Sequence, residues 1–300
     1  MGNPEFAVAS LKAICEAGFE VVAVITGPDK PAGRGLKMNQ SPVKEFASEH
    51  GLKVLQPEKL KNPMFIEELK NLKPDLGVVI AFRMLPEVVW SLPRLGTINL
   101  HASMLPQYRG AAPINWAIIN GEKETGLTTF FLKHEIDTGK LIFSEKVAIG
   151  PDETAGELHD RMMLVGANLI LKTLKAIEVG NFPQVEQVDN GNLKAAPKIY
   201  KETCQIDWNK TAAEVHNRIR GLSPHPAAFT IVNGKILKVF RSGKEEVSHN
   251  ITPGTFIKDG KEVLKVAVAD GFIHLIEVQP EGRKRMAVSE FLRGYSNWMD

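Results

Sequence analysis

The chain has 300 residues, of which 43% are hydrophobic and 24% charged, with a formal net charge of +2, which is ordinary for a folded protein of one large or two average domains. No run approaches the roughly 18 apolar residues of a membrane span. The first residues lack the basic and apolar pattern of a secretory leader, so we do not expect secretion. The two cysteines, Cys15 and Cys204, lie far apart without a CxxC or Cys/His cluster that would suggest a disulfide framework or a zinc site. We therefore expect a soluble, cytoplasmic, monomeric protein without a metal.

The charge is unevenly distributed. Residues 191–300 carry 17 Lys/Arg against 12 Asp/Glu, whereas the preceding 190 residues are slightly acidic. A basic C-terminal third favours a polyanionic partner such as a nucleic acid, although a merely solvated basic face has the same composition.

Over the first 180 residues, short apolar runs alternate with helix-like segments, which predicts a doubly wound, Rossmann-like α/β domain with a mainly parallel sheet. We expect strands at 21–26, 53–56, 75–82, 97–102 and 128–132, and helices at 4–17, 43–50, 64–72 and 113–120. A long helix follows, because Thr154 and Glu157 can form a capping box, apolar residues keep helical spacing, and Gly180 marks its end.

The beginning of the chain is unusual. Met1-Gly2-Asn3-Pro4 has the pattern of a turn that follows a strand and leads into a helix, but no strand precedes it. In a Rossmann-type sheet that strand is central. We therefore expect the first strand to be missing because the chain is numbered from an internal Met or trimmed.

Beyond Gly180 the pattern changes in kind. A polar, irregular stretch predicts a linker at 183–199, between a catalytic domain at 1–182 and a second domain at 200–300. After a helix at 211–221, Asn233-Gly234, Asp259-Gly260 and Asp270-Gly271 each separate two strand-like runs, which predicts consecutive hairpins. We expect a small C-terminal β-barrel of the oligonucleotide-binding (OB) kind.

The densest polar cluster runs from Asn99 to Gly110, at the carboxyl end of a predicted parallel strand, where open α/β sheets bind ligands. Asn99 and His101 are two residues apart, so both side chains leave a strand on one face and can hydrogen-bond to the same group. A structural histidine is the alternative, but the neighbouring Ser103 and Arg109 and the Pro- and Gly-containing loop favour a functional one.

Two further segments are candidates on weaker grounds. Asp137, in a turn with Gly139, follows another strand of the predicted parallel sheet and could reach the same crevice, although such turns usually serve only the backbone. The glycine-rich loop at 27–37 carries Lys30, Arg34 and Lys37, which suit contact with a phosphate backbone. This loop contains neither GxGxxG nor GxxxxGK[ST], which disfavours a nucleotide cradle, and a solvated loop is the alternative.

Taken together, these motifs resemble the methionyl-tRNA formyltransferase family over nearly the whole chain. The matching segments are 2–6, 31–35, 99–113, 137–139, 206–208, 219–220 and 224–226. The resemblance implies that Asn99, His101 and Asp137 are catalytic, that the donor is 10-formyltetrahydrofolate without a metal, and that the acceptor is initiator methionyl-tRNA.

The resemblance also implies roles for the surrounding residues. Ser103, Met104, Leu105, Pro106, Phe82 and Arg83 would line the folate site, Lys30, Arg34 and Lys37 would contact tRNA, and Phe6 would help to hold the methionyl side chain. Three positions depart from the family pattern: Asn3 replaces Thr, Phe82-Arg83 replaces the more common Tyr-Gly, and Met104 replaces Leu.

Three other functions fit parts of the sequence. A formyltransferase acting on a sugar nucleotide or on glycinamide ribonucleotide would share Asn99, His101 and Asp137 but would not need the Arg34 loop or a basic barrel. A nicotinamide-dependent oxidoreductase is disfavoured by the absent GxGxxG. A noncatalytic RNA-binding protein would leave the polar cluster at the strand end without a role.

Overall fold

The computed structural model describes residues 1–32, 37–189, 191–260 and 262–295. The chain divides into two compact units, each of which is described by itself. The first comprises residues 1–109, 126–147 and 159–194, and the second comprises residues 110–125, 148–158 and 195–300. The boundaries expected from the sequence, at 182/183 and 199/200, stay a prediction.

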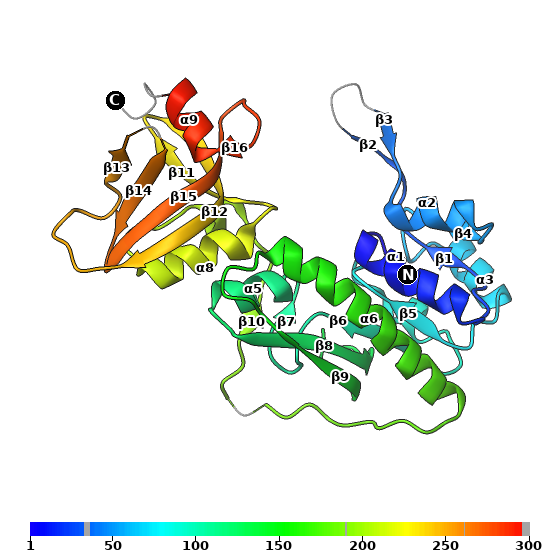
Figure 1. Cartoon of the computed structure of the whole chain (residues 1–300). Helices are drawn as coiled ribbons and strands as arrows, with labels where there is room; N and C mark the ends of the chain where they lie inside the picture. The colour runs from blue at the N-terminus through cyan, green and yellow to red at the C-terminus, as the bar shows by residue number, and fades with distance from the viewer. Residues whose placement is uncertain (33–36, 190, 261, 296–300) are drawn as a thin grey trace. The chain divides into compact units, whose positions relative to one another are not determined.

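Helices and short strands alternate in the first unit, as the apolar periodicity predicts (Figure 1). In chain order its elements are α1 (Glu5–Glu16), β1 (Val24–Ile25), β2 (Lys30–Ala32), β3 (Lys37–Asn39), α2 (Pro42–Glu49), β4 (Val54–Leu55), α3 (Pro63–Asn71), β5 (Gly77–Val79), α4 (Glu87–Trp90), β6 (Thr97–His101), β8 (Glu124–Phe131), β9 (Leu141–Ala148) and the long α6 (Ala155–Glu178). The predicted capping box of α6 is confirmed, since the Thr154 backbone N–H donates to the Glu157 carboxylate at 2.9 Å and the Glu157 backbone N–H donates to the Thr154 hydroxyl at 3.3 Å.

The expectation of a mainly parallel sheet is only partly correct. The largest sheet of this unit has the order β5-β6-β8-β9, in which β6 is parallel to β5 but antiparallel to β8, while β1 and β4 form a separate parallel pair. Helix α6 covers one face of the larger sheet: a Cβ built on Gly166 would lie 2.9 Å from Leu100 of β6 and 3.2 Å from Leu127 of β8. The sheet is therefore mixed, because β8 runs against β5 and β6.

Met1 and Gly2 lie between β1 and the end of β5. The Gly2 N–H donates to the Ile25 carbonyl at 3.1 Å and the Ile80 N–H donates to the Met1 carbonyl at 2.9 Å, with Gly2 and Ile80 forming a parallel bridge. Beyond them lies a cavity of about 570 Å³. Its apolar lining includes Leu11, Val22, Ala23, Leu76, Val78 and Ile177.

The expectation that a strand before residues 1–4 is missing stays a prediction. The terminal amine of Met1 donates to the Val78 carbonyl at 2.7 Å, and burial lowers the pKa of this amine to about 5. An ammonium group is disfavoured there because the surrounding side chains cannot replace its water shell.

The glycine-rich segment expected as a loop contains a small hairpin. Lys30 of β2 pairs with Asn39 of β3 in an antiparallel register. The hairpin is anchored at its base, since Lys44 lies 2.5 Å from the Asp29 carboxylate and the Gln56 amide also donates to that carboxylate at 2.8 Å. These hydrogen bonds lower the pKa of Asp29.

The second unit combines helices with an antiparallel sheet. Its elements are α5 (Pro113–Ile119), β10 (Ala195–Ala196), α7 (Lys201–Cys204), α8 (Ala212–Leu222), β11 (Ala228–Val232), β12 (Lys235–Glu246), β13 (Phe256–Asp259), β14 (Val263–Val268), β15 (Gly271–Pro280), β16 (Met286–Ala287) and α9 (Val288–Gly294), with β7 (Arg109–Gly110) at the boundary. Helix α8 begins at a full capping box of Thr211 and Glu214 and packs Ile219 and Leu222 into the core of this unit. All three predicted hairpins are confirmed.

The sheet order is β11-β12-β15-β14-β13, with β16 paired to β15. Among the strands that the structure describes, β11 and β13 end this order and are not paired with each other. The antiparallel C-terminal sheet is therefore confirmed, whereas its closure into an OB-type barrel stays a prediction.

Candidate active site

Strand β6 carries the two polar side chains that the sequence places at its end. Ile98 and Leu100 are buried, while Asn99 is half-buried and His101 is 6% exposed. In the part of the chain that the structure describes, no residue hydrogen-bonds to the Asn99 side-chain amide. The strand therefore leaves this amide able to bind an added group on the face that it shares with His101.

The imidazole of His101 is held by the backbone of the following loop. Its Nε2 lies 2.8 Å from the Tyr108 carbonyl oxygen. A carbonyl can only accept, so Nε2 carries the hydrogen and donates it. Nδ1 then faces the Asp137 carboxylate, with 3.7 Å between Nδ1 and Oδ2.

Asp137 reaches His101 by a route that the sequence did not indicate. The expectation that it follows a parallel strand is wrong, because β8 is antiparallel to β6 and ends beside the beginning of β6, with Phe131 opposite Ile98. The connection between β8 and β9 must therefore return toward the end of β6 to bring the carboxylate to the imidazole.

Two backbone features shape this return. Asp137 has a φ of +53°, in the left-handed region that Asp tolerates better than most residues. Gly139 lies against β8 so closely that a Cβ on it would be 1.6 Å from the Phe131 carbonyl oxygen. Only glycine fits this position, and the sequence pattern Asp-Thr-Gly is explained by that contact.

The loop after β6 is fixed to the neighbouring strand. Thr128, opposite His101 on β8, donates to the Ser103 carbonyl at 2.7 Å and accepts from the Leu105 N–H at 3.2 Å. The Ser103 hydroxyl donates to the Gln107 carbonyl at 2.6 Å. Ser103 and Leu105 are buried, whereas Met104 and Pro106 are partly exposed. Of the four predicted folate contacts in this loop, Met104 and Pro106 are thus the ones that a ligand can reach.

The other predicted folate residues, Phe82 and Arg83, follow β5. The Arg83 guanidinium donates to the Glu58 carbonyl at 2.9 Å and to the Pro57 carbonyl, and it lies 5.6 Å from the centroid of the Phe82 ring. Its Nε is buried without a hydrogen-bond partner among the described residues. The Arg83 side chain therefore joins the segment after β5 to the segment after β4. Contact of Arg83 or Phe82 with a folate stays a prediction.

Phe6 is not brought to the histidine and the carboxylate. It is 5% exposed, and its ring meets that of His159 edge-on at 5.2 Å. Phe6 and Leu100 both approach Gly166 of α6, and Leu100 leaves β6 on the face opposite to Asn99 and His101. Its role in holding a methionyl side chain stays a prediction that this packing does not favour.

The three cations of the glycine-rich segment are only partly described. Lys30 is exposed on β2, and Lys37 is the first residue of β3. Arg34 lies outside the described residues. Contact of these residues with tRNA stays a prediction.

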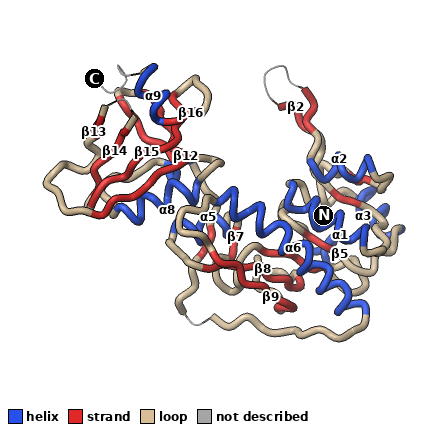
Figure 2. The backbone as a smooth tube through the Cα atoms, in the orientation of Figure 1, coloured by secondary structure: helices blue, strands red, loops and turns tan. Residues whose placement is uncertain are grey.

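Sequence reasoning missed the part played by the segment after α6, which was expected to be only a linker. This segment runs back along β9 (Figure 2), where Val185 and Leu141 form an antiparallel bridge. Farther on, the Tyr108 N–H donates to the Lys194 carbonyl at 2.6 Å, and the Gln187 side chain contacts the Asp137 turn. Its polar, irregular composition carries no signal by which these contacts could have been found.

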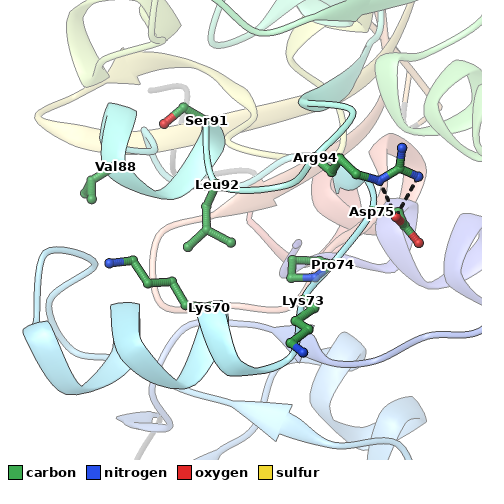
Figure 3. Close-up of a pocket in the computed structure, with 8 residues that line it drawn as sticks. All are labelled: Lys70, Lys73, Pro74, Asp75, Val88, Ser91, Leu92 and Arg94. Atoms are coloured by element: carbon green, nitrogen blue, oxygen red, sulfur yellow. Dashed lines mark hydrogen bonds and ion pairs between the residues drawn. The ribbon is translucent and has the colours of Figure 1, made fainter.

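The pocket drawn in Figure 3 contains none of the predicted site residues. It lies between α3 and α4 and is lined by Lys70, Lys73, Pro74, Asp75, Val88, Ser91, Leu92 and Arg94. The Arg94 guanidinium is paired with Asp75 at 2.8 Å, and both side chains are largely exposed. An exposed ion pair of this kind contributes little to stability.

Neither a metal cluster nor a membrane span is found in the described part of the chain. Within these residues, no three His, Cys, Asp or Glu side chains gather so that they could hold a metal ion. No described helix combines the length and the apolar character needed to cross a bilayer.

Comparison with known families gives a consistent result at both ends of the chain. A model described as formyl transferase matches residues 1–174, and one described as formyl transferase, C-terminal domain, matches residues 198–296. The methionyl-tRNA formyltransferases of Bacteroides fragilis and Flavobacterium johnsoniae are 53% and 51% identical to this chain. Each alignment covers 98% of this chain and 94% of the relative.

Solved structures share the fold at lower identity. An N-formyltransferase from Helicobacter canadensis, in complex with folinic acid and dTDP-3-aminofucose, has a TM-score of 0.70 and 24% identity, covering 93% of this chain and 97% of that chain. HypX from Aquifex aeolicus, in complex with tetrahydrofolic acid, has a TM-score of 0.61 and 21% identity, covering 82% of this chain and 44% of that chain. Likeness at this level of identity concerns the fold alone.

Proposed function

Because this chain belongs to the formyl transferase family, we propose that it transfers the formyl group of 10-formyltetrahydrofolate to the amino group of methionyl initiator tRNA. Relatives that are about half identical to the chain over nearly its whole length carry this activity in their names. The observation in the structure that best supports the proposal is the approach of His101 Nδ1 to the Asp137 carboxylate beside the end of β6.

The reaction needs a donor of hydrogen bonds and a carrier of protons. The amine attacks the formyl carbon, a C–N bond forms, and the carbonyl oxygen takes up negative charge. The bond from that carbon to the folate nitrogen then breaks, the new amide nitrogen loses a proton, and the folate nitrogen gains one. No covalent enzyme intermediate is required, since the amine is itself the nucleophile.

Asn99 and His101 meet these needs in different ways. The Asn99 amide, which has no partner among the described residues, would donate to the developing oxyanion; one such donor typically contributes about 3 kcal/mol. His101 would carry a proton on Nδ1, the ring nitrogen that Tyr108 does not hold, and would pass it to the folate nitrogen. The 3.7 Å between Nδ1 and the Asp137 carboxylate exceeds a hydrogen bond, so this proton is not committed to the carboxylate. Asp137 would orient the ring and favour its charged form by proximity.

The folate would be held by the loop after β6. Met104 and Pro106 offer partly exposed apolar surface for its ring system, while buried Ser103 and Leu105 keep the loop in shape. Asn99 fits the donor chemically, because its uncommitted amide matches a carbonyl oxygen.

The tRNA would be bound by charge. Lys30, Arg34 and Lys37 belong to the glycine-rich segment of the sequence at 27–37, and residues 191–300 carry an excess of positive charge. Such surfaces bind phosphates through release of counterions, without reading the sequence.

The test is a transfer assay with a choice of acceptors. Incubation with 10-formyltetrahydrofolate and either methionyl initiator tRNA or a nucleotide sugar should give formylation of the tRNA only. Asp137→Asn and His101→Ala should each lower single-turnover rates by about 10² to 10⁴. Their matched controls, Glu135→Gln and His134→Ala, change exposed side chains of the same connection and should be neutral. Near-native rates in the Asp137 and His101 variants, or formylation of the sugar alone, would contradict the proposal.

A further inference from the structure

The Gln187 side chain lies between Arg109 and the Asp137 turn, and it uses every hydrogen-bonding position of its amide. Its Oε1 accepts from Arg109 Nε at 3.1 Å and from Arg109 Nη2 at 2.6 Å. Its Nε2 donates to the Asp137 carbonyl and to the Gly139 carbonyl, each at 2.9 Å. A half-buried amide with four such contacts is fully satisfied.

The chemistry of the partners fixes the orientation of this amide. A guanidinium can only donate, so Oε1 must face Arg109, and backbone carbonyls can only accept, so Nε2 must face the turn. No other charged or neutral side chain of this length offers two acceptor positions on one atom and two donors on its neighbour.

The backbone on either side of Gln187 is also set. Two residues earlier, Val185 exchanges hydrogen bonds with Leu141 of β9, at 2.8 and 3.0 Å. Seven residues later, the Lys194 carbonyl accepts from the Tyr108 N–H. The segment is therefore anchored to the two stretches of chain that Gln187 connects.

Those two stretches determine where His101 and Asp137 lie. Arg109 follows Tyr108 directly, and the Tyr108 carbonyl fixes the imidazole through Nε2. On the other side, Gln187 binds the carbonyl of Asp137 itself, whose left-handed backbone needs support from its surroundings. The Gln187 amide thus connects Arg109 to Asp137. Arg109 follows Tyr108, which holds the imidazole, and Asp137 bears the carboxylate.

We propose that Gln187 is a positioning residue for the reaction: by joining Arg109 to the Asp137 turn, it sets the separation between the His101 imidazole and the Asp137 carboxylate. This inference rests on the proposed function. Gln187 does not touch the reacting atoms and acts only through Asp137.

The kinetic test uses two variants and a matched control. Gln187→Met keeps the length of the side chain and removes all four hydrogen bonds, while Gln187→Glu keeps the acceptor for Arg109 and sets an oxygen against two carbonyls. Each should lower kcat by about 10²-fold, as expected for a misplacement of about 1 Å, with KM changed by less than about 3-fold. Gln184→Met alters an exposed residue of the same segment and should leave both constants unchanged.

A double-mutant cycle separates positioning from a general structural role. If Gln187 acts through Asp137, adding Gln187→Met to Asp137→Asn should lower kcat by less than about 3-fold more, because the group that it positions is already lost. Fully additive losses, or a native kcat in both Gln187 variants, would overturn the inference while leaving the transfer activity of the unsubstituted protein intact.

A third measurement does not depend on activity. Hydrogen exchange in residues 133–139 should be at least about 10-fold faster in Gln187→Met than in the unsubstituted protein, with no change in Gln184→Met. If the unsubstituted protein transfers no formyl group, the proposed function fails, and exchange still decides whether the amide holds the turn. Unchanged exchange would show that the Gln187 amide does not hold the turn. The Gln187→Glu protein provides the same measurement if Gln187→Met does not fold.

Discussion

Substitution of Gly139 by Ala should lower turnover by about two orders of magnitude with a modest loss of stability. A Cβ at this position would lie 1.6 Å from the Phe131 carbonyl oxygen and 3.2 Å from Cδ2 of the Phe130 ring. Since Cβ contacts under 3.0 Å essentially never occur, the turn must move by at least about 1.4 Å, the shortfall from that limit. Asp137 moves with it, and a misplacement of about 1 Å near the chemistry can cost about 10²-fold in rate.

The measurement is the single-turnover rate of formyl transfer, together with the melting temperature. Forced overpacking typically costs about 1 to 3 kcal/mol, so the variant should remain folded at room temperature. Gly243→Ala is the control, because a Cβ there would meet nothing closer than His274 Cβ at 3.9 Å. A Gly139→Ala rate within about 3-fold of the native rate would show that the position of this turn does not govern the reaction.

Three other predictions concern stability and binding. Burial lowers the pKa of the Met1 amine from an ordinary 8.0 to about 5 in the folded chain, so the unfolded state binds more protons between these two pH values. The free energy of unfolding, measured by denaturant titration, should therefore rise by up to about 4 kcal/mol from pH 5 to pH 8. Acetylation of the amine should remove this dependence on pH. Thr211→Ala removes the capping box of α8 and should lower the free energy of unfolding by about 1 kcal/mol, measured by urea titration, with Thr252→Ala expected to be neutral; an equal loss in both variants would contradict the capping argument. Affinity for initiator tRNA should fall by about 10-fold or more between about 50 and 200 mM salt, and a salt-independent Kd would refute phosphate binding by the basic segments.

Much of the fold follows from local sequence signals. Asn233-Gly234 predicts a tight hairpin because both residues can adopt positive φ, and the structure has φ of 47° and 77° there. The capping box of Thr154 and Glu157 likewise predicts where α6 begins, since it satisfies backbone groups that the helix leaves free. The alternation of Asn99, Leu100 and His101 assigns their faces correctly for the same reason: a strand has a period of two.

The direction of β8 is not a local property, and sequence reasoning therefore assigned it wrongly. The apolar run of this strand can be buried in either direction, and the choice depends on β6 and β9 on its two sides. Contacts between segments far apart in the sequence could not be predicted, for the same reason. Gln187 lies fifty residues from Asp137 in a stretch without periodicity, so no spacing in the chain connects the two.

The cavity between β1 and β5 has a consequence for handling the 300-residue chain. Strands β1 and β5 each end their sheet among the described strands, and apolar side chains flank the space beside them. A sheet edge of this kind is a template on which another extended chain can pair. Concentrated or warmed solutions should therefore lose protein to edge-to-edge aggregation, and hydrodynamic sizing is best performed on dilute, cold samples.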